Sequence, residues 1–366
     1  MSSAPVSIEN PRSRAELEDF ARLPFAVYAD RPAWWPPDIQ NEVDLLSRRS
    51  PISPFLEIEP FVARRNGKTV ARVSAVINRR YNDHWKEKLG QLIHFEAMPD
   101  EDEAATILLE TGAESLRQRG MEGARSGFAA FLDYPYAIDG YGEFPSFLLR
   151  ANPACYHRYL KNAGFETERG QLDYTASLTP EILARYDGML EAARRGGIQL
   201  RSWREFGFLA AVDSWTSITN VAFRNHWGWN PVTNAEVRPM LTSLWETPVS
   251  DLSMIALLDG RVAGAVFCVP DLSESLASLK RGVKLAVDKG GGTRGALINI
   301  GVIDEARGRG VARAMAARSF LAMARQGMRY AGYTLVLDDN WPSRRCAESL
   351  GARVTANFLT YRRNFH

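Results

Sequence analysis

Hydrophobic positions along the chain change repeatedly between an alternating pattern, typical of β-strands, and a three-to-four-residue spacing, typical of helices. Asn66-Gly67, a strong signal for a two-residue hairpin, separates two of the alternating segments. The elements predicted for the first half are, in order, a strand at 6–9, helices from Arg14 and over 38–48, a hairpin of 61–65 and 69–78, a strand at 89–96, and helices over 100–119 and 155–162.

The second half, after Gly164-Phe165, repeats this order of elements. Thr179-Pro180 predicts a helix start, because threonine caps helices and proline favours the first helical position. That helix ends at Gly196-Gly197, which we interpret as a linker region. The elements that follow are a strand at 198–203, helices over 206–223 and 234–245, a hairpin of 252–258 and 262–269, a strand at 296–303, a helix from Gly310, a strand at 333–337 and a helix that ends at Leu350-Gly351.

This duplication predicts an α/β protein of two similar domains, each a mixed central sheet flanked by helices. We place the boundary between residues 178 and 179. The chain has 366 residues, a net charge of +2 and 45% hydrophobic residues, which is the composition of a soluble globular protein and gives no argument for nucleic acid.

The cysteines and the hydropathy of the chain indicate in which cellular compartment the protein works. Cys155, Cys268 and Cys346 lie far apart without metal-ligand spacing, so we expect reduced thiols, a cytoplasmic protein and no metal. The first residues hold no apolar core of a signal peptide, and no run approaches the length of about 18 apolar residues that a membrane span needs.

One stretch near the end of the chain predicts an anion site. The strand at 296–303 runs into the sequence DEARGRGVA (304–312), and a helix that is apolar nearly all round follows. A helix N-terminus offers free N–H groups and a positive dipole, and glycine lets the backbone approach a ligand closely. We therefore expect a phosphate group here; the alternative is an ordinary helix start.

The same stretch resembles the pyrophosphate loop of the GCN5-related N-acetyltransferase (GNAT) superfamily, Arg/Gln-x-x-Gly-x-Gly/Ala, at Arg307, Gly310 and Ala312. Asn340, eleven residues before Gly351, has the spacing of that family's asparagine and Gly-Phe pair. The resemblance implies acyl-CoA or CoA as donor substrate, held by Ile300, Val302, Arg307, Gly308, Arg309, Gly310, Val311, Ala312 and Asn340.

The chain departs from the family where catalysis is concerned. The tyrosine that the family often places seven residues after the asparagine, as general acid for the thiolate, is Ala347 here, and the Gly-Phe pair is Gly351-Ala352. Asn299 and His226 are our candidates for orienting the amine or relaying its proton. A structural histidine is the alternative for His226.

The first half has no such loop. Its strand-to-helix turn carries four acids at 100–103, which suit a helix N-terminus but repel a pyrophosphate. We therefore expect domain 1–178 to bind no CoA and to shape the acceptor site or complete the fold, with domain 179–366 binding acyl-CoA. His94 and Glu96, two apart on one strand, either reach a shared cleft or form a buried ion pair.

Two features suggest a lipid acceptor. Aromatic segments occur at 24–28, 34–37 and 223–229, the last between two helices, where the family holds its acceptors; core packing is the alternative. The insertion at 271–295 combines helically spaced leucines with lysine and arginine, a pattern of helices that lie on membranes, although such a helix also packs on its own protein.

The tandem layout, with its tryptophan segments, resembles a bacterial group of acyl-CoA N-acyltransferases that includes the bacterial ceramide synthases. The resemblance implies transfer of a fatty acyl group to a long-chain sphingoid amine, in sphingolipid biosynthesis. If the acceptor is a lipid, we expect peripheral contact at the inner membrane through 271–295, on the pattern described above. The alternatives are a small-molecule N-acetyltransferase that uses acetyl-CoA and a non-catalytic CoA-binding protein.

Overall fold

The computed structural model describes residues 4–31, 33–130, 132–147, 149–271, 273 and 292–365. The chain forms two compact units, Met1–Gly170 with Phe358–His366 and Gln171–Asn357, and each has its own hydrophobic core. Strands β7 (Glu166–Ser177) and β13 (Arg353–Asn364) both contain residues of each unit, because the chain passes between the units within them.

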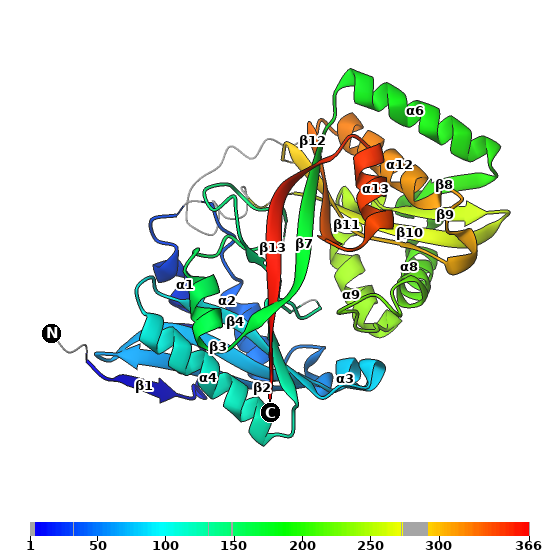
Figure 1. Ribbon diagram of the computed structural model, residues 1–366. Coiled ribbons are helices and arrows are strands. Elements are labelled where there is room, and N and C mark those ends of the chain that lie inside the picture. Colours follow the sequence, from blue (N-terminus) through cyan, green and yellow to red (C-terminus); the bar gives the residue numbers. More distant parts are fainter. Residues whose placement is uncertain are drawn as a thin grey trace. The chain divides into compact units, whose positions relative to one another are not determined.

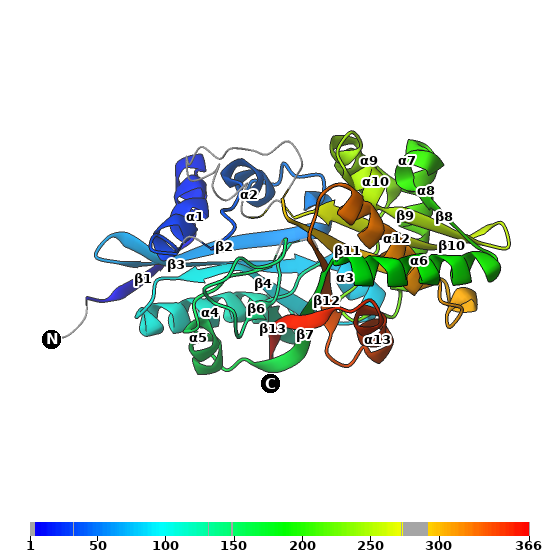
Figure 2. The ribbon, with the colours of Figure 1, turned by 90° about the horizontal axis from the view of Figure 1, so that it is seen from above.

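The first unit contains a five-stranded run β1-β2-β3-β4-β5, with the end of β13 beside β5. Only β4 and β5 are parallel in this run. Figure 2 shows α1 and α2 above these strands and α4 and α5 below them. The elements are β1 (Val6–Glu9), α1 (Arg14–Val27), α2 (Ile39–Leu46), η1 (Ser53–Phe55), β2 (Leu56–Arg65), β3 (Lys68–Asn78), α3 (Arg79–Trp85), β4 (Leu89–Ala97), α4 (Asp102–Gln118), β5 (Gly123–Ser126), β6 (Tyr136–Ala137) and α5 (Tyr156–Asn162).

Local sequence explains where several of these elements begin and turn. Ser13 caps α1, since its hydroxyl accepts from the Glu16 N–H at 3.3 Å while the Glu16 carboxylate accepts from the Ser13 N–H at 2.8 Å. Asn66 and Gly67 both have positive φ (51° and 74°), as a two-residue hairpin turn requires, and they join β2 to β3. The predicted hairpin is therefore confirmed.

The second unit has the strand order β8-β9-β10-β11-β12-β7, in which only β11 and β12 are parallel. Its elements, shown from green to red in Figure 1, are α6 (Pro180–Arg195), β8 (Ile198–Ser202), α7 (Trp203–Phe206), α8 (Phe208–Ala222), α9 (Asn234–Leu244), α10 (Val249–Leu252), β9 (Met254–Leu258), β10 (Arg261–Pro270), β11 (Arg294–Val302), η2 (Asp304–Ala306), α12 (Val311–Arg325), β12 (Tyr330–Leu337) and α13 (Trp341–Ser349).

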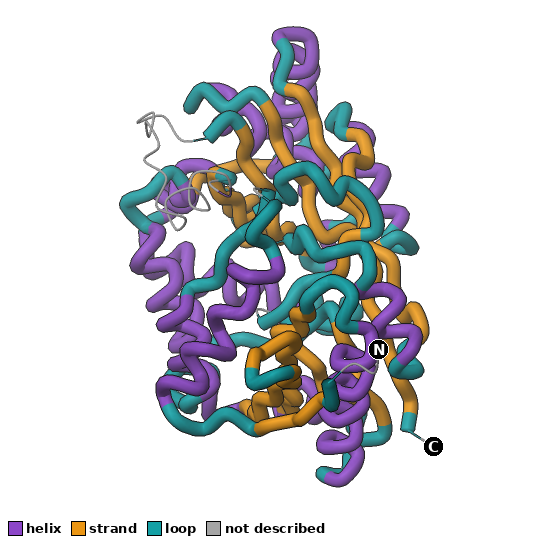
Figure 3. The backbone as a smooth tube through the Cα atoms, turned by 90° about the vertical axis from the view of Figure 1, so that its left-hand side faces the viewer, coloured by secondary structure: helices purple, strands orange, loops and turns teal. Residues whose placement is uncertain are grey.

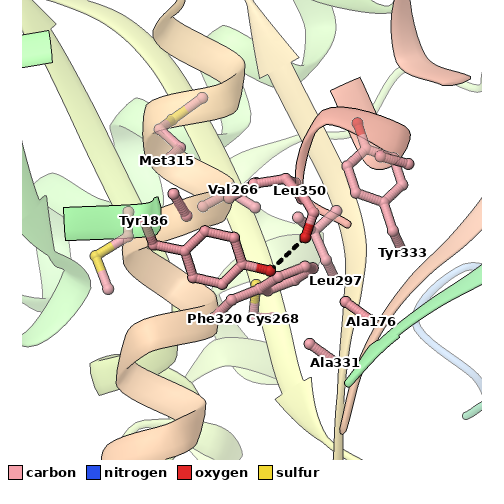
Figure 4. Close-up of a cluster of buried hydrophobic side chains, with 14 of the residues drawn as sticks. Ala176, Tyr186, Val266, Cys268, Leu297, Met315, Phe320, Ala331, Tyr333 and Leu350 are labelled. Carbon is pink, nitrogen blue, oxygen red and sulfur yellow. Dashed lines mark hydrogen bonds between the residues drawn. The ribbon is translucent and has the colours of Figure 1, made fainter. Parts of the chain in front are cut away.

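Helices cover both faces of this second sheet. A Cβ added to Gly264 of β10 would meet Met315 of α12 at 2.8 Å, and one added to Gly301 of β11 would meet Ala222 of α8 at 3.0 Å. Figure 4 shows the core on the α12 side, where the buried Tyr186 hydroxyl donates to the carbonyl oxygen of Leu350 at 2.6 Å. In Figure 3 helices flank the strands accordingly.

Two details differ from the predictions. The helix predicted over 206–223 is two helices, α7 and α8, because Gly207 between them has a φ of 92° that no helix accommodates. Gly196 and Gly197 form the turn between α6 and β8 inside the second unit, so they are not a linker between units.

The remaining predictions of element type hold, and both units show the same order of strands around one parallel pair. Most of the segment 271–295, where we predict an amphipathic helix, lies outside the described residues. In the part of the chain that the structure describes, no helix is both long and apolar enough to cross a membrane.

Candidate functional site

Two parallel strands of the second unit separate partway along their length. β11 pairs with β12 from Arg294, opposite Tyr330, to Leu297, opposite Tyr333, and the register of the two strands ends there. The Thr334 hydroxyl donates to the Leu297 carbonyl oxygen at 3.1 Å and so marks the point of separation. Beyond it, one edge of β11 is left without a strand, and its backbone groups can pair with an extended ligand.

A β-bulge lies just past this point. Phe267 of β10 pairs with Asn299 while Cys268 pairs with Leu297, so Ile298 is the extra residue. The Asn299 Oδ1 atom is buried and has no hydrogen-bond partner among the described residues. A bulge changes the direction of the side chains next to it, and Asn299 is the residue that directly follows this bulge. Its catalytic role stays a prediction.

The glycine-rich turn ends the open edge. Gly308 and Gly310 have φ values of 75° and 85°, in the left-handed region, which requires glycine. Gly310 is the N-cap of α12 and has no side chain to accept from the first turn, so the N–H groups of 311–313 are free of intrahelical partners. A Cβ at Gly308 would meet nothing within 4 Å, which shows that the turn is open on its outer side. The turn therefore has the form of an anion site.

Two arginines of the turn are held by neighbouring acceptors. Arg307 pairs with Asp304 at 3.0 Å and donates to the carbonyl oxygen of Ala222, at the end of α8, at 3.2 Å. Arg309 lies 3.5 Å from Asp259. Both arginine side chains are about half exposed (58% and 48%), and exposed pairs of this kind are weak, so an incoming phosphate can recruit either guanidinium.

The loop after α8 carries the aromatic residues singled out in the sequence. Phe223 stacks on Trp229 with ring centroids 5.3 Å apart, and His226 meets the Phe223 ring edge-on at 5.2 Å. The His226 Nδ1 atom lies 3.1 Å from the Trp227 carbonyl oxygen. The imidazole is thus packed in an aromatic group, in keeping with the structural alternative, and a role in proton relay stays a prediction.

Asn340 caps a helix. Its Oδ1 atom accepts from the Ser343 N–H at 3.3 Å at the start of α13, and Ala347, where the family places its tyrosine, is fully buried. Tyr333, the last residue of β12 to pair with β11, brings its hydroxyl to 3.0 Å from the Ser343 Oγ. Burial raises the pKa of Tyr333 well above its ordinary value. No local pattern predicts this phenol, because only the pairing of β12 with β11 brings it to the separation point.

Five buried polar atoms on the α8 side of the second unit's sheet have no hydrogen-bond partner among the described residues. They are Trp203 Nε1, Trp215 Nε1, Thr216 Oγ1, Thr219 Oγ1 and Asn299 Oδ1. A buried polar group that stays unpaired costs about 1–3 kcal/mol, so several together are a substantial fraction of the stability of a domain. This cluster needs a polar occupant, either water or a ligand.

The corresponding strands of the first unit also separate. β4 pairs with β5 from Leu89, opposite Gly123, to Leu92, opposite Ser126, and its register with β3 shifts just beyond that point. Matching Leu92 with Leu297 makes Phe95 correspond to Ile300 and Ala97 to Val302.

Side chains of the first unit occupy this second open edge. Arg150 donates to the Phe95 carbonyl oxygen at 3.0 Å, and the Tyr156 hydroxyl accepts from the Ala97 N–H at 2.8 Å. These are the backbone positions that the family resemblance assigns to the pantetheine arm in the second unit. The chain therefore fills in one unit the edge that it leaves open in the other.

The acidic turn of the first unit is neutralised internally. Arg65 binds Glu101 at 3.0 Å and Glu103 at 2.8 Å, and Arg158 binds Asp102. The turn has no glycine at 98–103 and presents carboxylates to its own arginines. It offers no site for a phosphate.

Glu96 and His94 bond to different groups and not to each other. The buried Glu96 carboxylate accepts from the hydroxyls of Tyr28 at 2.9 Å and Tyr156 at 2.7 Å, and burial raises its pKa. The His94 Nδ1 lies 3.2 Å from the Ser74 hydroxyl, and burial lowers the pKa of this imidazole. The ion pair considered from the sequence is not formed; the Glu96 side chain is buried and the His94 side chain is partly buried.

Comparison with known proteins agrees with this architecture. Residues 213–352 match the Acetyltransferase (GNAT) family. The second unit therefore contains a GNAT-type domain, and this match, together with the similarity to the relatives below, supports an N-acyltransferase. Among the described residues, no group of three or more His, Cys, Asp and Glu side chains is arranged to hold a metal ion.

Three relatives are similar to this chain. Bacterial ceramide synthase of Caulobacter vibrioides is 26% identical over 283 residues, which cover 76% of this chain and 73% of the relative. A tandem GNAT protein from the clavulanic acid biosynthesis pathway is similar in structure over 98% of both chains, with 14% identity and a TM-score of 0.57. A fungal multi-domain β-N-acetylglucosaminidase with a glucosamine N-acetyltransferase region matches 99% of this chain at 16% identity and a TM-score of 0.60, and this chain spans only 38% of it. The two structural likenesses confirm the predicted fold.

Proposed function

We propose that the protein transfers a fatty acyl group from acyl-CoA to the amine of a long-chain sphingoid base. The observation that carries the donor half is the open edge of β11 running into the uncapped N-terminus of α12. The acceptor half is supported by the similarity to the protein of Caulobacter vibrioides that is named bacterial ceramide synthase.

Different residues of the second unit bind different parts of the acyl-CoA donor. The backbone of Ile300 and Val302 pairs with the amide-rich pantetheine arm, as a strand would. The N–H groups at 308–312, with Arg307 and Arg309, hold the pyrophosphate, because they combine free donors, a helix dipole and mobile positive charge. Asn340 reaches the pantetheine with its amide nitrogen, since its oxygen caps α13.

The transfer joins the amine nitrogen to the thioester carbonyl carbon and breaks the carbon–sulfur bond. The thiolate that leaves takes a proton, and the amine gives one up. Asn299, directly after the bulge, orients the amine, because its Oδ1 atom is free to accept from an N–H group. We assign the proton for the thiolate to Tyr333 in place of the missing tyrosine at 347. Burial keeps its phenol protonated, and Ser343 holds its oxygen.

A transfer assay across donors and acceptors tests the proposal. Release of free CoA thiol is followed with acyl-CoA donors of increasing chain length, each with a sphingoid base or with a small hydrophilic amine. The proposal expects the highest kcat/KM with a long-chain donor and the sphingoid base. Preference for acetyl-CoA and the small amine establishes the small-molecule N-acetyltransferase instead. CoA binding without turnover of any pair establishes a binding protein.

Access to a lipid acceptor supports a contact with the membrane surface. Segment 271–295, mostly outside the described residues, carries Leu272, Leu276 and Leu279 together with Lys280, Arg281 and Lys284. Apolar stripes bordered by basic residues bind anionic lipid reversibly. We include this segment in the proposal as the part of the chain that meets the bilayer.

A further inference from the structure

We propose that Trp203, Trp215, Thr216, Thr219 and Asn299 form the site that binds the neutral, hydroxyl-bearing head of the acceptor amine. This inference rests on the proposed N-acyltransferase function and deepens it. It names what the acceptor must carry beside its amine: at least one hydroxyl group close to the nitrogen, and no anionic group.

Aromatic contacts tie three of these residues to one place on the sheet. Trp203 stacks on Phe267 with ring centroids 5.6 Å apart, and Trp215 of α8 meets the same ring at 6.1 Å. Phe267 pairs across the strands with Asn299. Paired residues of neighbouring strands point to the same face of a sheet, so Asn299 shares the face that α8 covers.

The two threonines lie on the part of α8 that spans this region. A Cβ added to Gly301 would meet Ala222 at 3.0 Å and Ile218 at 3.4 Å, and Gly301 lies two residues after Asn299 on the same face of β11. Trp215 contacts Phe267 of the sheet two turns before Ala222. Thr219, four residues after Trp215, lies on the same side of the helix, and Thr216 is next to Trp215 in the chain. The exposed fractions of Thr216 and Thr219 are 6% and 0%, so bulk water does not satisfy the hydroxyls.

The chemistry of the five groups selects the ligand. The Asn299 Oδ1 atom accepts from an amine or hydroxyl, the two indole N–H groups donate to a hydroxyl oxygen, and the threonine hydroxyls do either. None of the five side chains carries a charge, so the set offers nothing to balance a phosphate or carboxylate. An amine flanked by hydroxyls uses every one of these groups.

The position also suits the reaction. Asn299 follows the bulge at Ile298 and lies two residues past Leu297, where β11 separates from β12 and its edge opens toward the glycine-rich turn. An amine that donates to Asn299 therefore lies beside the edge that holds the donor. Hydroxyl groups next to that amine reach the face under α8.

The test compares two acceptors in an isosteric variant. Thr219→Val removes the hydroxyl and keeps the shape. A medium-chain 2-amino-1,3-diol and the alkylamine of equal length without hydroxyls are titrated calorimetrically and assayed as acceptors. We expect the Kd and KM of the amino-diol to rise about tenfold in the variant and those of the alkylamine to stay unchanged, since a site built to bind a hydroxyl loses only the ligand that has one. Thr242→Val, at an exposed position of α9, is the matched control and should change neither.

Thermal stability provides the second readout. The buried Thr219 hydroxyl has no hydrogen-bond partner among the described residues, so Thr219→Val should raise the Tm measured without acceptor and reduce the additional rise that the amino-diol produces. A lower Tm with unchanged amino-diol affinity would show that the hydroxyl holds a structural water only, and would overturn the inference. Equal wild-type affinity for both acceptors would overturn it as well. Failure of the proposed function would be a separate result, in which no amine is acylated, whether or not Thr219→Val changes the affinity for the amino-diol.

Discussion

The guanidinium of Arg150 donates to the carbonyl oxygen of Phe95 at 3.0 Å, on the strand edge that corresponds to Ile300 in the second unit. Tyr156 closes the same edge at Ala97. A tandem chain of two similar units thus keeps one edge open for a ligand and fills the other with its own side chains. The asymmetry lies in long-range hydrogen bonds as well as in the loop sequences.

This asymmetry predicts a single CoA site in each chain. The first unit lacks both an open edge and a glycine-rich turn, whereas the second has both. Isothermal titration of CoA into the protein should give a stoichiometry near one. A value near two would show that Arg150 and Tyr156 yield to the ligand and that the acidic turn accepts a pyrophosphate.

Substitutions at two glycines near the ends of α12 distinguish an effect on ligand binding from an effect of backbone strain. Gly310 and Gly327 both have a φ of 85°, and neither has close neighbours at the position of a Cβ. Gly310→Val and Gly327→Val should each cost about 1–3 kcal/mol of unfolding free energy, because valine is strained in this region. Only Gly310→Val should raise the Kd of CoA, by tenfold or more. Equal affinities in the two variants would remove the turn from the site.

Tyr333→Phe tests the proposed proton donor. The variant should lower kcat strongly, and it should weaken the binding of CoA but not of desulfo-CoA, which lacks the sulfur that we propose the phenol contacts. Tyr330→Phe changes an exposed tyrosine of the same strand (40% exposed) and serves as control. If Tyr333→Phe lowers stability and leaves kcat and both affinities unchanged, its hydroxyl serves only to bond Ser343.

The partly buried His94 predicts a dependence of stability on pH. Burial lowers its pKa in the folded protein below the ordinary value of 6.5, so the unfolded chain takes up this proton first as the pH falls. The stabilisation is therefore present above about pH 6.5 and is lost as the pH falls through the folded-state pKa. His94→Asn removes the titration, and asparagine tolerates the φ of 57° found here. As the pH falls from about 7 to about 5, the difference between the Tm of the variant and that of the wild type should become more favourable to the variant. Above about pH 7.5 this difference should stay constant. A constant difference throughout would contradict the prediction.

Binding to vesicles tests the basic segment. Lys280, Arg281 and Lys284 should each contribute up to about 1 kcal/mol near an anionic surface, so the protein should sediment with anionic vesicles at low salt. Changing all three to glutamate should abolish this, and neutral vesicles should bind much less. Wild-type protein that stays in the supernatant at low salt would leave the acceptor to arrive from solution.

The sequence by itself determined most of the elements and the local form of the glycine-rich turn. Ser13, Asn66-Gly67 and Thr179-Pro180 act through bonds within a few residues, so their effects on helices and turns are readable from the chain. The turn at 307–312 is equally local, because left-handed glycines and an uncapped helix start need no distant partner. Duplication of the element order was sufficient to predict a tandem protein.

Only the tertiary structure decided which groups meet. Arg150 reaches Phe95 across 55 residues, and Tyr333 reaches β11 through the pairing of parallel strands. The orphaned hydroxyl of Thr219 is recognisable only once α8 is packed on the sheet. Hydrogen bonds between distant residues depend on how strands pair and helices pack. Those arrangements arise from burial of the whole core, so no local pattern of the sequence records them.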